Sequence, residues 1–353
     1  MTMSPKERFL SRSTSSSILV LLLALFTAGC KAYINRVSFP PPQAAINMIY
    51  DDDCDGDIDC AVTQPIIHHW IDLGYIKMWG MVSSGPSELG APTMKVFRHY
   101  YGHDGLFSIG AWTPGCELRQ SAAWNIALVN KFDPGDVCTN YENCAQVTRQ
   151  AIANYIAGGG KANGLAYVMT GPLTCEEAFR TSLADAISPL TGAQMEQQYI
   201  SQFVLMNGCA PPTTKCTTEG NCESYIDACS AFFANATSQN GYPPVYVVPL
   251  NTGAASVYTQ VPVASLPLTN PTAYAYTSIG RDSTADEDPL SVEFAVIGST
   301  GWILSANSTD TVSTATNENS WNNGKASGQY YLTTSASPYS FEIVLSNPWI
   351  PGP

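Results

Sequence analysis

The chain has 353 residues, of which 45% are hydrophobic and 13% are charged, and its formal net charge is −13. This length and apolar fraction are sufficient for a full hydrophobic core, in one large domain or two. The strong acidity argues against a nucleic-acid partner and against binding to an anionic membrane surface through charge.

The first 30 residues are typical of an export signal. A basic start is followed by the apolar run Ser17–Ala28, which is short for a membrane-spanning helix. The sequence T-A-G-C ending at Cys30 resembles a bacterial lipobox. We therefore expect export, either as a lipoprotein anchored to a membrane through lipidated Cys30 or as a secreted or periplasmic protein. Residues 31–44 are expected to be a linker, and residues 45–353 a single domain.

Six acidic residues lie within nine positions directly after the first predicted strand, Ile46–Tyr50. They are Asp51, Asp52, Asp53, Asp55, Asp57 and Asp59. Carboxylates this dense repel one another unless a cation neutralises them or the segment is a solvated loop. Oxygen ligands suit calcium, and α/β folds place their ligands at the C-terminal ends of strands. The segment also matches the start of an EF-hand loop, although position twelve would be Val62, so structural calcium without catalysis is a competing interpretation.

The rest of the chain alternates strand-like and helix-like patterns. Strands are predicted at Tyr75–Ser83, Leu165–Thr170, Gln202–Met206 and Val245–Leu250. Helices are predicted at Ala61–Leu73, Thr93–Tyr101, Gln146–Ile156, Glu176–Ile187 and Ser224–Ala234. This alternation predicts an α/β, Rossmann-like fold with a mostly parallel central sheet flanked by helices.

Residues 251–353 have a different composition, rich in Ser, Thr and Asn. Short strand-like runs occur at Gly301–Ser305, Gln329–Thr333 and Phe341–Leu345. They predict a β-rich C-terminal segment of the same domain.

Ten cysteines follow Cys30, and an even number in an exported chain favours disulfides, up to five. Zinc is the alternative, but the chain has no C-x-x-C pair. We expect disulfides above all among Cys209, Cys216, Cys222 and Cys229, which crowd one polar loop.

Five motifs in chain order resemble the inosine-uridine preferring nucleoside hydrolase family. They are Asp51-x-Asp53-x3-Asp57-x-Asp59-Cys60-Ala61, Y-V-M-T-G-P-L-T ending at Thr174, Asp185–Gly192 followed by Phe203–Gly208, Glu219-Gly-Asn221, and Asn270-Pro271 followed by Asp286–Pro289. The resemblance covers about residues 45 to 350. Where the family usually has a second Asp that binds calcium, this chain has Cys60.

The resemblance implies an exported hydrolase that cleaves the N-glycosidic bond of ribonucleosides with a calcium-bound water. Asp59 would be the catalytic base and a ribose contact. The other ribose contacts would be Met206, Glu219 and Asn221, and calcium would be held by Asp53, Asp57, Asp288 and the carbonyl of Thr174. A homo-oligomer is compatible with this reading. The alternative is a catalytically impaired calcium- or ribose-binding protein of the same fold, and a disulfide at Cys60 would favour it, because calcium does not prefer sulfur.

Overall fold

The computed structural model of the protein describes residues 44–211, 220–253, 258–261, 263–264, 266–285, 287–316 and 318–334. These residues belong to one compact unit that extends from Pro40 to Pro353. Within these described ranges, no helix combines the length and the apolar character needed to cross a membrane.

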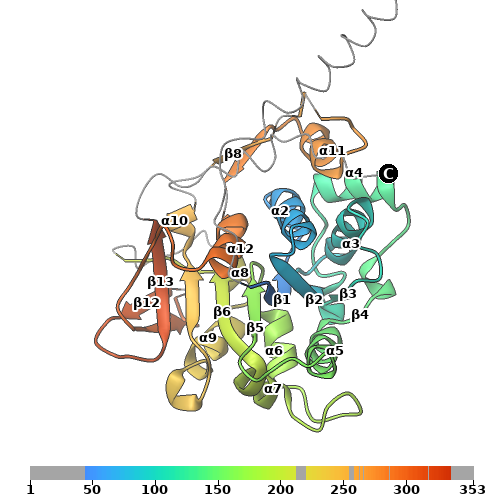
Figure 1. The fold of residues 1–353 in the computed structure, drawn as a ribbon. Coiled ribbons are helices and arrows are strands. Elements are labelled where there is room, and N and C mark those ends of the chain that lie inside the picture. The colour runs from blue at the N-terminus through green and yellow to red at the C-terminus, as the bar shows by residue number, and fades with distance from the viewer. Residues whose placement is uncertain are drawn as a thin grey trace, which may run out of the picture. The chain divides into compact units, whose positions relative to one another are not determined.

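The unit is built on a nine-stranded sheet with the strand order β10-β13-β7-β6-β5-β1-β2-β3-β4 (Figure 1). The strands are β1 (Ile46–Asp52), β2 (Ile76–Ser83), β3 (Ser108–Ala111), β4 (Glu142–Asn143), β5 (Leu165–Met169), β6 (Ile200–Met206), β7 (Val245–Val248), β10 (Trp302–Leu304) and β13 (Gln329–Thr334). All neighbours are parallel except β10, which runs antiparallel to β13. The expected mostly parallel sheet is therefore confirmed.

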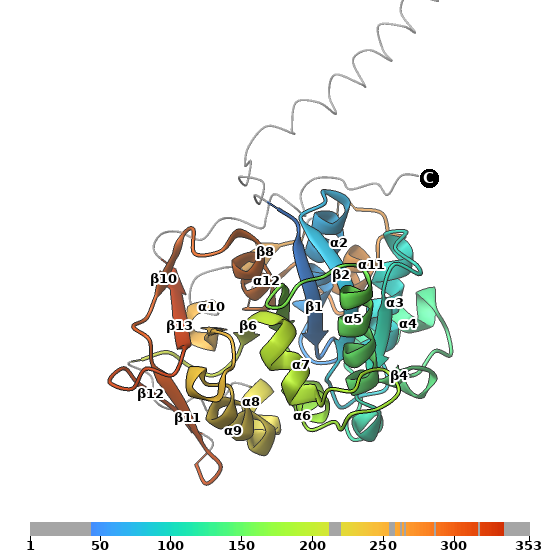
Figure 2. The ribbon, with the colours of Figure 1, turned by 60° about the horizontal axis from the view of Figure 1, so that its bottom comes forward.

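Helices cover both faces of this sheet (Figures 1 and 2). One face carries α2 (Cys60–Asp72), α3 (Gly90–Tyr100), α4 (Ala123–Phe132), α11 (Pro271–Ser278) and α12 (Glu287–Ile297). The other carries α5 (Cys144–Ala157), α6 (Thr174–Arg180), α7 (Gly192–Tyr199) and α9 (Ile226–Asn235). Alternate residues of β1 enter two separate cores: Met48 and Tyr50 pack on the α2 side, and Ile49 packs on the α5 side. This two-sided burial explains why β1 is a continuous apolar run.

The order of the strands creates a switch point beside β1. The chain builds β2, β3 and β4 on one side of β1 and then crosses to place β5, β6 and β7 on the other. The C-terminal ends of β1 and β5 therefore diverge into loops that leave in opposite directions. Open α/β sheets bind ligands at such a point.

The predicted helix Glu176–Ile187 is wrong in its second half. Helix α6 ends at Arg180, and a loop leads to α7, which the sequence pattern did not reveal. The loop supplies hydrogen-bond acceptors for Arg149, whose side chain is only 1% exposed. Its guanidinium donates to both carboxylate oxygens of Asp185, at 2.9 and 3.0 Å, and to the carbonyl of Ser188. Asp185 also accepts from the N–H groups of Ile187 and Ser188, at 2.9 and 3.1 Å, and these side-chain bonds take the place of a helical ladder.

The C-terminal part is β-rich only after residue 301. The expected strands at Gly301–Ser305 and Gln329–Thr333 are confirmed as β10 and β13, and β11 (Thr309–Ser313) and β12 (Glu318–Asn322) form a separate antiparallel hairpin. Before them the chain forms α11 and α12, and the short pair β8 (Tyr258–Gln260) and β9 (Ser283–Ala285). The strand expected at Phe341–Leu345 lies outside the described residues.

Four disulfides join described cysteines. They are Cys54–Cys60, Cys116–Cys138, Cys144–Cys175 and Cys222–Cys229. Cys209 is disulfide-bonded as well, and Cys216 lies outside the described residues. The preference for disulfides over zinc is thereby confirmed for these cysteines, and several disulfides are typical of proteins outside the cytoplasm.

Candidate functional site

A cavity of about 460 Å³ lies where the parallel strands end. Asp53 follows β1, Pro86 follows β2, Thr170 follows β5, and Met206 is the last residue of β6. All four line the cavity. The cavity therefore occupies the switch-point position expected for a ligand site.

Six of the predicted site residues meet at this cavity. They are Asp53, Asp57, Asp59, Met206, Asn221 and Asp288. Thr174 is not part of the lining; it begins α6, and its hydroxyl donates to the carbonyl of Ser84 at 2.8 Å. Glu219 lies outside the described residues. Segments more than 200 residues apart in sequence thus contribute to one acidic site.

The acidic stretch divides into two groups of three. Asp53, Asp57 and Asp59 line the cavity, whereas the side chains of Asp51, Asp52 and Asp55 are fully buried.

The buried carboxylates help to hold the loop. Asp52 accepts hydrogen bonds from the Tyr50 hydroxyl at 2.9 Å and from the N–H of Cys54 at 3.1 Å. Asp55 accepts from the N–H of Ser87 at 2.9 Å, and a Cβ on Gly85 would collide with that carboxylate. Burial is the main cause that raises the pKa of Asp52 and of Asp55 to about 6. These buried carboxylates therefore have a structural role. Part of the acidic cluster that was interpreted as a calcium site in the sequence holds the loop instead.

Asp59 lies at the N-termini of two helices. It is the residue preceding α2, and the N–H of Asp288, near the start of α12, points to its Oδ2 at 3.4 Å. The N-terminus of α12 therefore faces this carboxylate, and the positive end of that helix dipole attracts its negative charge. Asp59 is only 4% exposed, so its charge acts in a region shielded from bulk water.

The cavity carries excess negative charge. Four carboxylates line it, from Asp53, Asp57, Asp59 and Asp288, and Arg119 is the one cation among the described residues of the lining. Burial raises the pKa of Asp53 well above its ordinary value, the neighbouring carboxylates, Asp55 foremost, raise it further, and Arg119 acts in the opposite direction. Such a site favours a positively charged occupant or a substrate that becomes positive as it reacts.

Asn221 is held in one orientation at the floor of the cavity. Its amide nitrogen donates to the carbonyls of Thr170 at 2.8 Å and Met206 at 3.2 Å. These two carbonyls stand at the ends of β5 and β6, so the sheet fixes the amide. The thioether of Met206 lies 3.3 Å from the same nitrogen and also lines the cavity.

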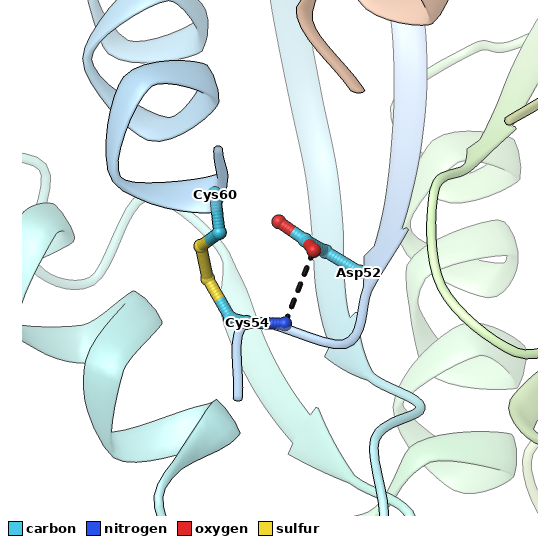
Figure 3. A group of neighbouring side chains, drawn as sticks. All are labelled: Asp52, Cys54 and Cys60. Carbon is cyan, nitrogen blue, oxygen red and sulfur yellow. Dashed lines mark hydrogen bonds between the residues drawn. A yellow bond between two sulfur atoms is a disulfide. The ribbon is translucent and has the colours of Figure 1, made fainter. Parts of the chain in front are cut away.

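Cys60 is joined to Cys54 beside this site (Figure 3). The bond closes a ring of the chain that contains Gly56, Asp57 and Asp59, which line the cavity. Ligand atoms of Asp52, Cys54 and Cys60 lie within 4.8 Å of one another. Because the two sulfurs are bonded to each other, neither is a thiolate that could bind a metal. In the described part of the chain, the carboxylate oxygens of no three residues lie this close together.

Sequence reasoning did not find Arg119 and Tyr225, which also line the cavity. Arg119 is in a polar loop after β3, and its backbone N–H donates to the carbonyl of Pro86 at 3.0 Å. Tyr225 separates α8 (Gly220–Ser224) from α9, and its ring packs edge-on against Trp112 with centroids 5.0 Å apart. The one usable signal was that Tyr225 lies four residues after Asn221.

The fold is similar to solved structures of known activity. No protein-family model and no curated protein matches the chain. A purine-preferring ribonucleoside hydrolase from Gardnerella vaginalis matches with a TM-score of 0.58 and 14% identity, over 85% of this chain and 97% of that one. An inosine-uridine preferring nucleoside hydrolase from Bacillus anthracis matches with a TM-score of 0.60 and 11% identity, over 86% and 98%.

A third structure, the type III effector protein XopQ in complex with adenosine diphosphate ribose, matches with a TM-score of 0.56 and 12% identity, over 87% of this chain and 92% of that one. The matches extend over nearly the full length of each of these proteins. With the parallel sheet and the acidic cavity at its switch point, they show that this chain has the nucleoside hydrolase fold.

Proposed function

We propose that the protein hydrolyses the N-glycosidic bond of a ribonucleoside, releasing a base and ribose. One observation carries the proposal: Asp53, Asp57, Asp59 and Asp288 line a single cavity, together with Asn221, at the switch point of this fold. The same residues belong to the sequence motifs that resemble the nucleoside hydrolase family. Their meeting in space supports the roles that the resemblance implies.

The chemistry suits an acidic cavity. Breaking a glycosidic bond builds positive charge on the ribose carbon, and nearby carboxylates stabilise that charge. Asp59 is proposed to take the proton of the attacking water. Its contact with the N–H of Asp288 holds the carboxylate in place, and its burial keeps bulk water from competing. Asn221 and Met206 are proposed to lie against the sugar, with Glu219 as a further ribose contact.

A calcium ion is proposed to be bound by Asp53, Asp57, Asp288 and the carbonyl of Thr174. The donor set fits in kind, because hard oxygens are the ligands that calcium prefers. Among the described residues the carboxylate oxygens of no three lie within 4.8 Å of one another, so binding would have to draw these carboxylates together. It also fits in charge, since burial and neighbouring carboxylates raise the pKa of Asp53 in a way that a cation would offset. When bound, such an ion would lower the pKa of a water and help to position it.

A non-catalytic binding protein of the same fold is the second candidate function. It is favoured by the Cys54–Cys60 disulfide, which occupies the position where the resemblance expects a calcium-binding Asp. A cavity that binds calcium or ribose without cleaving a nucleoside would retain Asp53 and Asn221 in their proposed roles. It would have no use for Asp59 as a base.

We further propose that the protein is exported, because its disulfides are typical of oxidising compartments. Anchoring through lipidated Cys30 and free secretion remain the two proposed forms. A small nucleoside is the proposed partner, without nucleic acid, and a homo-oligomer is compatible with the fold.

The test is ribose release. The purified protein is incubated with inosine, adenosine and uridine, in calcium or in a chelator, and reducing sugar is measured. We expect release that depends on calcium for at least one nucleoside. Calorimetric binding of ribose or calcium without release from any nucleoside would instead support the binding protein.

A further inference from the structure

The residues that line the cavity fall into two groups by their chemistry. Hydrogen bonds join Asp288 to Asp59 and Asn221 to Met206, which makes the sugar-side group proposed above. A second group, here called the Arg119 wall, consists of Pro86, Leu118, Arg119 and Tyr225. The charge of Arg119 lowers the pKa of Tyr225, although burial and Asp55 raise it overall, so these two side chains lie within electrostatic reach. No role has been assigned to this wall.

The loop that carries Arg119 is fastened at several points. The backbone of Arg119 pairs with Ser87 in an isolated parallel bridge, and its N–H donates to Pro86. The disulfide Cys116–Cys138 begins three residues earlier, and the N–H of Cys138 donates to the carbonyl of Glu88. The backbone that carries the Arg119 side chain at the cavity is therefore held in place.

The guanidinium itself is available for a ligand. It is exposed, and it forms no hydrogen bond or ion pair with the described part of the chain. Gly56 leaves space beside it: an ideal Cβ at this position would lie 4.0 Å from Nη2 of Arg119 and 3.3 Å from Oδ2 of Asp53. A side chain at position 56 would therefore begin between Asp53 and Arg119 and take up part of the space between them.

The chemistry of the wall matches a heterocyclic base. Tyr225 offers an aromatic ring, Leu118 and Pro86 offer apolar surface, and a planar ring system would bury against both. Arg119 offers a rigid fork of N–H donors, which suits two acceptors on one edge of a planar group. The O6 and N7 atoms of a 6-oxopurine present such an edge, whereas adenine has an amino donor in place of O6.

A phosphate is the other group that an arginine fork could bind, but the charges disfavour it. The four carboxylates of the lining outnumber Arg119, and the cavity stays negative even with one divalent cation bound. An added phosphate would therefore be repelled, while a neutral base would not.

We propose that Arg119 determines base specificity and selects 6-oxopurine nucleosides, such as inosine, by donating to O6 and N7 while Tyr225 packs against the ring. The assignment of the cavity to a nucleoside rests on the proposed function; the choice of base rests on the Arg119 wall.

The test compares inosine with adenosine, which share the sugar and differ in the edge that Arg119 would meet. Binding is measured by calorimetry, and ribose release is measured in parallel. In the unmodified protein inosine should be preferred.

Arg119→Ala should reduce the ratio of the affinities for inosine and adenosine roughly 10- to 100-fold, the loss expected for a bidentate contact. Arg119→Lys should restore the preference only in part, because a lysine keeps the charge and can reach these acceptors but lacks the rigid fork. Arg281→Ala, which removes the same charge at an exposed position outside the lining, should leave the ratio unchanged.

Each outcome separates the two proposals. Arg119-dependent preference for inosine in binding, without ribose release, would overturn hydrolysis and keep the base assignment. Equal loss for inosine and adenosine in Arg119→Ala, or no binding of either nucleoside, would overturn the base assignment. Stronger binding of inosine 5′-monophosphate than of inosine, lost in Arg119→Ala, would overturn it in favour of a phosphate contact.

Discussion

At the scale of single residues, Asp53 is a cavity-lining carboxylate whose charge is poorly compensated. It is half-buried, and the nearby acids Asp55 and Asp52 disfavour its charged form. Arg119 acts on it electrostatically but forms no ion pair with it among the described contacts. A cation at this position would therefore gain more from Asp53 than from a carboxylate that is already hydrogen-bonded, such as Asp52.

We predict that Asp53→Asn weakens the stabilisation of the protein by calcium. A ligand that binds only the folded state contributes about 2.7 kcal/mol at a hundredfold excess over its Kd, which should raise the Tm by several degrees. In Asp53→Asn most of this shift should disappear. The control is Asp104→Asn, which removes an exposed carboxylate outside the cavity. Differential scanning calorimetry in calcium and in a chelator measures the shift, and equal calcium shifts in both variants would contradict the prediction.

Asp59→Asn should separate catalysis from metal binding. Asn is nearly isosteric with Asp and can still accept from the N–H of Asp288, so the loop should keep its position. It cannot take a proton from water. Ribose release should therefore fall by about 10²–10⁴-fold, the range for loss of a general base, while the calcium-induced rise in Tm is largely kept. Full activity in this variant would exclude Asp59 as the base.

At the scale of elements, the sequence pattern predicted the strands that are buried along their whole length. It did not predict the elements whose formation depends on tertiary contacts. β1, β2, β5 and β6 are long apolar runs, and their pattern predicted them. β4 has only two residues, Glu142–Asn143, and no pattern of that length can be detected. The sequence pattern did not predict helix α12, because the helix begins at Glu287 within an acidic motif. Its packing against α2, a contact distant in sequence, stabilises it.

The same distinction applies to the site. The acidic motif and the segment around Asn221 are local in sequence, so motif spacing could identify Asp53, Asp59 and Asn221. Arg119 reaches the cavity only because its loop pairs with Ser87, which is 32 positions earlier. Spacing alone contains no information about that pairing. Likewise, nothing local distinguished buried Asp52 and Asp55 from the acids that line the cavity.

The disulfide Cys54–Cys60 should matter more for activity than for global stability. It closes a ring that includes Asp57 and Asp59, and the ring is also held by the hydrogen bond of Asn125 to the carbonyl of Cys54, at 2.6 Å. Loss of so small a loop should cost on the order of 2 kcal/mol in unfolding free energy. In the double variant Cys54→Ser, Cys60→Ser, we therefore expect a folded protein with strongly reduced ribose release at temperatures well below its Tm.

The matched comparison is Cys116→Ser with Cys138→Ser, which opens a larger loop, with a sequence separation of 22 residues rather than 6. This variant should lose at least as much stability and should mainly change the preference between bases, because that disulfide supports Arg119. Thermal unfolding followed by circular dichroism gives the stabilities. If ribose release followed Tm alone across both double variants, the ring around Asp59 would have no specific role.

At the scale of the whole molecule, several carboxyl groups are buried away from the surface. Burial is the main cause that raises the pKa of Glu176 and of Asp310 to about 7, as it raises those of Asp52 and Asp55 to about 6. Each of these groups binds a proton more tightly in the folded protein than in the unfolded chain, where its pKa is near 4.

This determines the sign of the pH dependence of stability. Between about pH 4 and pH 7 the folded state holds more protons at these groups than the unfolded state does. Their contribution to stability is therefore fully present below pH 4 and is lost as the pH rises toward 7. Groups of opposite sign reduce this gain: Asp185, whose pKa is lowered by its hydrogen bond to Arg149, acts below about pH 4, and His68 and His69, whose pKa is lowered by burial, act as the pH falls below about 6.5. The raised carboxyl groups outnumber these two histidines between pH 4 and pH 7.

We therefore predict that, with a chelator present, the Tm of the protein rises when the pH is lowered from 7.5 to 5. Asp310→Asn should flatten the response. Asp310 is 2% exposed and lies in the β11–β12 hairpin, where its carboxylate accepts from the amide of Asn319 at 3.2 Å. An Asn at this position keeps an acceptor but does not titrate. At one pKa unit per 1.36 kcal/mol, the pH-dependent part that it removes is roughly 2–4 kcal/mol.

Calcium should reduce the response in both proteins, since bound cation stabilises the charged carboxylates of the cavity at neutral pH. Calorimetric scans at several pH values measure all three effects, and a Tm that falls steadily from pH 7.5 to 5 in the chelator would show that the buried carboxyls do not govern stability in this range.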